Sequence, residues 1–237
     1  TLTVEAVSVV DGTVYHDAVV SSDEQDPSPE DASDLSAHIA FSLDTDGAST
    51  DPVISADGAV IAFRSEATNL NGGDTNSAAD VYVSDSTGIT RVSLTNLGAE
   101  GDGWSGQLFG IDLSGDGQLV LFASGATNLV AGDTNGWVDI FLRDRAAGTT
   151  ERVNLSTTGA EGDKSSRSGT ISNDGNLIAY DSAATNMVPG DTNNFPDCFL
   201  FDRAAGRSEE HTSELQSRRT LLCRLRLEKK NTTHSHS

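Results

Sequence analysis

The stretch SGDGQLVLF, residues 114–122, joins a tight-turn motif to an uninterrupted apolar run. Glycine directly after aspartate favours a hairpin turn, because glycine adopts positive φ without a Cβ clash. A short apolar run without polar alternation is typical of a strand that is covered on both faces. The stretch therefore predicts a turn followed by a buried strand.

The same stretch recurs along the chain with a constant spacing. The Asp-Gly pair stands at Asp57, Asp116 and Asp174, so its copies are 59 and 58 residues apart. A second marker, Asp-Thr-Asn, is repeated with the same two spacings. Two independent markers in one register indicate an internal repeat of about 58 residues.

Each repeat predicts four short antiparallel strands. In the central repeat the strand after the turn covers residues 119–122, a polar loop follows, and a third apolar strand covers 140–142. Residues 152–155 supply the fourth strand, and residues 91–94 are their counterpart in the first repeat. Four-stranded antiparallel sheets that are buried on both faces are typical of propeller blades, whereas solenoids, the rival architecture, have shorter repeats that are not built from hairpins.

The sequence thus predicts an all-β fold, an incomplete β-propeller of about three four-stranded antiparallel blades. The expected blades cover about residues 51–96, 107–156 and 168–206 within a propeller region at 37–206, and the third blade is expected to lack its last strand. Residues 1–36 are expected to be a strand-like piece followed by an acidic linker.

The C-terminal segment differs from the repeats in composition. Residues 207–217 resemble a translated sequencing adapter, and the Arg-rich run after them resembles its continuation. We therefore expect residues 207–237 to be a non-native tail with disordered or arbitrary structure, and the functional argument leaves them out.

The repeat resembles the TolB-like β-propeller repeat family over roughly residues 37–206. The Ser-x-Asp-Gly turn, the apolar strand ending in Phe or Tyr, the Ala-Thr-Asn loop and the segment DIFLRD at residues 139–144 carry the resemblance. Such propellers serve as binding platforms, as covers of peptidases and as bacterial surface proteins. The resemblance implies an exported bacterial protein, extracellular or periplasmic.

The composition narrows the classes of partner. The chain has 15 Lys and Arg against 36 Asp and Glu, a net charge of −21, and phosphate binding needs the opposite sign. No apolar run approaches the length of a membrane span. We therefore expect a protein or glycan ligand, no nucleic acid and no membrane span.

No catalytic residues stand out in the repeats. The segment GWSG at residues 103–106 lacks the residue that the Gly-x-Ser-x-Gly elbow places between serine and the second glycine. We expect a non-catalytic binding or surface-interaction propeller module that is stabilised by calcium. The alternative is the accessory propeller half of a larger hydrolase, a peptidase or a carbohydrate-active enzyme, whose catalytic domain lies outside this sequence.

The loop Asp-Thr-Asn-x-x-x-Asp is the candidate metal site. Its oxygen-bearing side chains suit Ca²⁺, which takes 6–8 oxygen ligands, so backbone carbonyls, waters or a neighbouring acid must complete each site. The alternative is turn chemistry, in which Asp and Asn bond nearby backbone N–H groups. The candidate ligands are Asp74, Asn76 and Asp80, then Asp133, Asn135 and Asp139, and finally Asp191, Asn193 and Asp197.

Overall fold

The computed structural model describes residues 3–10, 13–19, 45–107, 110–191, 194–204 and 207–210. The chain divides into two compact units, Thr1–Thr45 and Asp46–Ser237. Three predicted segments lie outside the described residues: the acidic linker, the start of the propeller region at 37–44, and the tail from 211 onward.

The first unit contains a hairpin. Strand β1 (Thr3–Val10) pairs antiparallel with β2 (Thr13–Val19), and the register shifts between Ala6 and Ser8.

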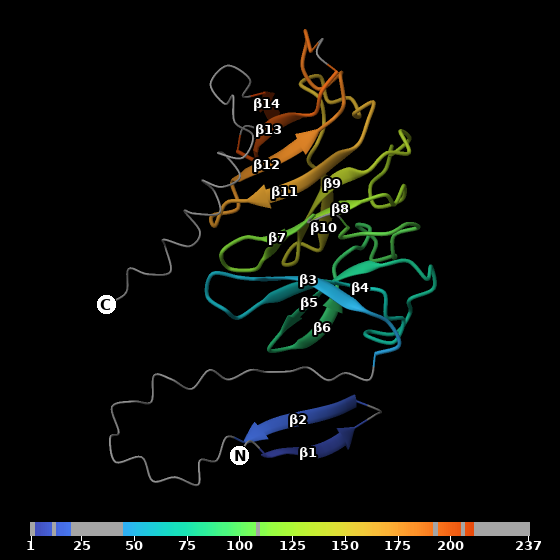
Figure 1. The fold of residues 1–237 in the computed structure, drawn as a ribbon, viewed down its shortest axis with the longest axis vertical. Coiled ribbons are helices and arrows are strands. Elements are labelled where there is room, and N and C mark those ends of the chain that lie inside the picture. Colours follow the sequence, from blue (N-terminus) through green and yellow to red (C-terminus); the bar gives the residue numbers. More distant parts are fainter. Residues whose placement is uncertain are drawn as a thin grey trace, which may run out of the picture. The chain divides into compact units, whose positions relative to one another are not determined.

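The second unit contains three sheets, each of four antiparallel strands in chain order (Figure 1). Each strand after the first in a sheet pairs with the strand that directly precedes it in the sequence, as in a series of hairpins. The first sheet consists of β3 (Ser49–Ile54), β4 (Ile61–Ser65), β5 (Asp80–Asp85) and β6 (Gly88–Arg91). The second consists of β7 (Ile111–Leu113), β8 (Leu119–Ser124), β9 (Asp139–Asp144) and β10 (Thr149–Arg152). The third consists of β11 (Ser166–Ile171), β12 (Leu177–Ser182), β13 (Asp197–Asp202) and β14 (Arg207–Glu210).

The sheets stack face to face, and β8 of the second sheet contributes to both junctions. Its alternate residues Val120 and Phe122 belong to the apolar core shared with the first sheet. Leu119 and Leu121 belong to the core shared with the third sheet. Every residue of β8 is buried, as the unbroken apolar run predicts. The all-β fold and the incomplete propeller of four-stranded sheets are confirmed.

The Ser-x-Asp-Gly turns are ordered by their own side chains. In the second sheet Ser114 Oγ donates to Asp116 Oδ1 at 2.6 Å, and the N–H of Gln118 donates to the same oxygen at 3.0 Å. Gly117 has φ +66°, the left-handed conformation that favours glycine. The turns of successive sheets also bond to one another, because Ala56 N donates to Gly115 O at 2.9 Å and Gly115 N donates to Asn173 O at 2.8 Å.

The fourth strands differ from the prediction. Strands β6 and β10 end at Arg91 and Arg152, the residues at which the predicted strands begin. Tight turns cause the difference: the N–H of Thr87 donates to Asp85 Oδ1 at 2.8 Å, so the chain reverses directly after β5. The next residue, Val92, is then free to fill the core between the sheets.

The third sheet also differs from the prediction, because it has a fourth strand. Strand β14 pairs antiparallel with β13, with Phe199 opposite Glu210 and Asp202 opposite Arg207. Its four residues are the first residues of the expected non-native tail. An open strand edge pairs with an extended segment through main-chain groups and does not require a particular sequence. Across the described residues no helix is long and apolar enough to cross a membrane.

Candidate metal centre

The predicted ligands lie in the loop between the second and third strands of each sheet. Asp80 and Asp139 are the first residues of β5 and β9, and both are fully buried. Asp197 opens β13 in the same way and is half-buried. Asn193 lies outside the described residues.

The two described asparagines shape their loops. Asn76 accepts from the N–H of Ala78 at 2.5 Å and donates through Nδ2 to Gly101 O at 2.6 Å. Asn135 accepts from the N–H of Trp137 at 2.8 Å and donates to Gly162 O at 3.1 Å. Their amide groups therefore tie each long loop to the linker that leads into the next sheet, which is the turn chemistry of the alternative interpretation.

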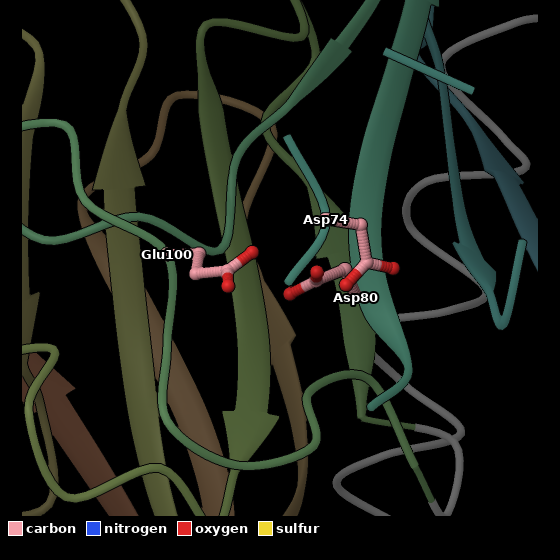
Figure 2. Close-up of side chains that lie close together, drawn as sticks. All are labelled: Asp74, Asp80 and Glu100. Atoms are coloured by element: carbon pink, nitrogen blue, oxygen red, sulfur yellow. The ribbon is translucent and has the colours of Figure 1, made fainter. Parts of the chain in front are cut away.

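The aspartates meet a third acid that sequence reasoning missed. In the first cluster, carboxylate oxygens of Asp74, Asp80 and Glu100 all lie within 4.8 Å of one another. Figure 2 shows Glu100 turned toward the two aspartates from a neighbouring segment. Glu100 is placed there by an isolated antiparallel bridge to Leu94, which folds the linker back along the end of β6.

The second cluster repeats this arrangement one sheet further on. Oxygens of Asp133, Asp139 and Glu161 lie within 4.8 Å of one another, and Glu161 is bridged to Leu155. Both glutamates occupy the same place in the repeated linker sequence Gly-Ala-Glu-Gly-Asp. That repeat was the available signal for them, but the spacing alone did not show which loop they would meet.

One arginine lies inside each cluster. Arg152 Nη1 is 2.6 Å from Glu161, 3.1 Å from Asp139 and 3.3 Å from Asp133. In the first cluster Arg91 Nε is 3.3 Å from Asp80, and its Nη1 contacts Glu100. Three ionised carboxylates and one guanidinium leave each cluster with a net charge of −2.

Each cluster contains a buried carboxylate oxygen without a hydrogen bond from the described residues. These are Asp80 Oδ2 and Asp133 Oδ1, and the side chains are 0 % and 2 % exposed. Burial raises the pKa of Asp80 from 3.8 to about 6. Burial and then the charge of Asp139 raise the pKa of Asp133 to about 6 as well. Each of these oxygens has an ion-pair contact at 3.3 Å, Asp80 Oδ2 with Arg91 Nε and Asp133 Oδ1 with Arg152 Nη1. One guanidinium does not balance three carboxylates, and buried charge that is not fully compensated is costly.

Glu161 behaves in the opposite way. The Thr134 hydroxyl donates to its carboxylate at 2.6 Å, and Arg152 adds a second contact. The hydrogen bond from Thr134 is the main reason that its pKa falls from 4.5 to about 2. Glu161 therefore stays ionised at every pH at which the aspartates titrate.

The third repeat lacks this constellation in the part of the chain that the structure describes. Asp191 and Asp197 do not gather a third acid among those residues. The register of β14 accounts for the missing arginine, because Glu210 lies opposite Phe199, where Arg91 and Arg152 lie opposite Tyr82 and Phe141.

The comparisons with known proteins concern the fold. No protein-family model matches the chain, and no curated protein matches it. Similar solved structures include TolB from Acinetobacter baumannii, at 21% identity and a TM-score of 0.42 over 70% of this chain and 32% of that one. Putative TolB from Agrobacterium tumefaciens has 18% identity and a TM-score of 0.42 over 68% and 45% of the two chains. The β-propeller domain of the Trilobed protease from Pyrococcus furiosus has 11% identity and a TM-score of 0.41 over 69% and 41%. This chain thus spans less than half the length of each, and TolB structures are among its matches, as the sequence resemblance predicts.

Proposed function

We propose that the three-sheet stack is a non-catalytic binding or surface-interaction propeller module of an exported protein, and that Ca²⁺ stabilises its loops. The observation that carries the calcium part is the net charge of −2 around a buried carboxylate oxygen that accepts no hydrogen bond, in each of two repeat-related clusters. A divalent cation balances that charge, and carboxylate oxygens are the ligands that Ca²⁺ prefers.

The arginine limits where an ion can bind. Arg152 Nη1 contacts all three acids, most closely Glu161, so the ion is expected beside Asp133 Oδ1 and away from the guanidinium. Two or three side chains do not complete a calcium sphere, so waters and loop carbonyls are expected to supply the remaining oxygens. Sites with so few charged ligands are weak, which suits the millimolar Ca²⁺ outside cells and supports an extracellular or periplasmic location.

Calcium at these positions would hold the long loops in place. Each cluster joins one loop to the linker that enters the next sheet, and the loops carry exposed residues such as Trp137. A fixed loop loses less conformational entropy when it binds a partner, and this supports a binding role for the loop surface. The ligand proposed for this surface is a protein or a glycan, because the net charge of −21 repels polyanions.

Thermal unfolding with and without Ca²⁺ tests the calcium proposal. We expect millimolar CaCl₂ to raise the Tm relative to EGTA at constant ionic strength, because an ion that binds only the folded state stabilises it. Asp133→Asn and Asp80→Asn should each reduce the rise, and the double variant should abolish it. Glu66→Gln removes an exposed charge outside the clusters and should leave the rise unchanged. Equal melting curves for the parent in CaCl₂ and EGTA would refute the calcium proposal.

The binding role has a separate test. The loop surface should bind a protein or glycan ligand in a pull-down or glycan-array experiment, and Trp137→Ala should weaken that binding while the Tm in CaCl₂ stays unchanged. Ligand binding that survives changes throughout the loop surface would place the interaction elsewhere on the module.

A further inference from the structure

The junction between the first and second sheets contains a buried guanidinium that is bound by groups of the same chain. Arg143 extends from β9, and its Nη1 lies 3.2 Å from Thr95 O and 3.4 Å from Leu94 O. It also donates to Thr150 Oγ1 at 3.0 Å. The side chain therefore fills the space between β9 and the residues that follow β6.

The same repeat forms the junction between the second and third sheets, but with a different residue at this position. The segment DIFLRDRAAG at 139–148 aligns with DCFLFDRAAG at 197–206, so Phe201 stands where Arg143 stands one repeat earlier. Leu155 and Ser156 correspond in the same way to Leu94 and Thr95. A phenyl ring has no donor to offer these carbonyl groups.

A cavity of about 510 Å³ lies at this second position. Its lining includes Leu155, Ser156, Phe201 and the two arginines Arg152 and Arg203, together with the exposed residues Glu151 and Thr157. Its lining includes the counterparts of both residues whose carbonyls bind Arg143. The residues equivalent to those that bind the Arg143 guanidinium thus line a cavity in the second junction.

We propose that this cavity binds an arginine side chain of a partner protein or peptide. The guanidinium enters as Arg143 does in the first junction, donates to the carbonyl oxygens of Leu155 and Ser156, and lies against the ring of Phe201. A planar cation with several donors matches two neighbouring carbonyls better than a lysine ammonium does. The ring adds cation–π attraction. Glu151 lies 3.6 Å from Arg203 Nε, so its carboxylate already balances the charge of that arginine in the lining.

Peptide binding measured by NMR tests the proposal in the full chain. N-acetyl-Gly-Arg-Gly-amide is the probe, and N-acetyl-Gly-Lys-Gly-amide is the matched control for general attraction to an acidic protein. We expect saturable amide shifts at Ser156, Thr157 and Phe201 with the arginine peptide, at an affinity at least ten-fold higher than for the lysine peptide. Equal affinity for the two peptides, or shifts spread over the acidic surface, would overturn the proposal.

Three variants place the binding at the cavity. Phe201→Arg supplies the guanidinium from within the chain and should abolish peptide binding. Phe201→Leu keeps an apolar side chain without the ring and should weaken binding a few-fold. Arg143→Phe should open a second cavity and raise the stoichiometry from one peptide to two. Unchanged peptide binding in Phe201→Arg refutes the proposal. If that variant fails to fold, the proposal is refuted when Phe201→Leu keeps the parent's affinity and Arg143→Phe keeps the parent's stoichiometry.

Discussion

The buried carboxylate oxygen that accepts no hydrogen bond belongs to Asp133 in the second cluster but to Asp80 in the first, and these residues occupy different places in the repeat. Asn154 and Ser93 are equivalent, and each donates to the Oδ1 atom of the aspartate beside it. Asp139 Oδ2 also accepts from Asn135 and Arg152. In the first cluster Asn76 donates to Gly101 O, and Asp80 Oδ2 has an ion pair with Arg91 but no hydrogen bond. The donors around Oδ2 thus decide which carboxylate oxygen lacks a hydrogen bond.

The raised pKa of Asp133 predicts a specific pH dependence. Its pKa is 3.8 in the unfolded chain and about 6 in the folded one, so the folded protein binds the extra proton. Its contribution to the free energy of unfolding is therefore fully present below about pH 4 and lost as the pH rises through about 6. Asp133→Asn cannot titrate, so in EGTA its stability relative to the parent should increase between pH 4 and pH 7.

Urea denaturation at several pH values across that range measures this difference. Curves for Asp133→Asn that run parallel to the parent would show that Asp133 titrates normally in the folded state.

At the scale of the element, the Asp-Gly turn has different neighbours in successive sheets. Gly58 and Gly117 occupy the same turn position with φ of +74° and +66°. A Cβ added at Gly58 meets nothing within 4 Å, whereas one at Gly117 would lie 2.5 Å from the Cβ of Val60 in the first sheet. The conformation of the turn is thus the same, but the second turn packs tightly against a neighbouring sheet and the first does not.

Alanine at these two positions separates backbone strain from packing. Gly58→Ala should lower the free energy of unfolding by about 1–2 kcal/mol, the cost of the left-handed conformation for an L-residue. Gly117→Ala adds an overpacking cost of about 1–3 kcal/mol to the same strain. Urea denaturation of both variants measures the difference, and equal losses would show that Val60 moves aside without cost.

The elements also show what the sequence can and cannot predict. The repeat period, the turns and the apolar strands could be predicted from the sequence, because each depends on residues that are close together in the chain. Glu100 was not readable as a member of the first cluster, because its position depends on the bridge to Leu94 that folds the linker back. The cavity lined by Phe201 could not be predicted either, because its meaning depends on comparing its lining residues with the groups that bind Arg143.

At the scale of the whole molecule, the net charge of −21 opposes the compact state. Local ion pairs act against this repulsion, and one of them, between Arg145 and Asp85, joins the second sheet to the first. The repulsion acts over longer distances than these contacts, so salt should screen the repulsion more strongly than the partly buried pairs.

We therefore expect the Tm in EGTA at pH 7 to rise as NaCl increases from 20 to 500 mM. The Debye length is roughly 10 Å at 0.1 M and shortens as salt is added, so this range runs from weak to strong screening. Calorimetry in a series of NaCl concentrations measures the slope. A Tm that falls with salt would mean that the ion pairs, and not the long-range repulsion, dominate the electrostatic free energy.

The hydrogen bonds between successive turns have a consequence for how such a chain can evolve. The bonded residues are Ala56, Gly115 and Asn173, which occupy the variable position of the Ser-x-Asp-Gly motif. Only their main-chain groups take part, so the connection from sheet to sheet needs no particular side-chain donor or acceptor, although a Cβ at Gly115 would lie 3.0 Å from Asn173 O. A duplicated repeat with a small residue at this position therefore brings the groups that couple it to its neighbour, and the length of the array can change by gene duplication.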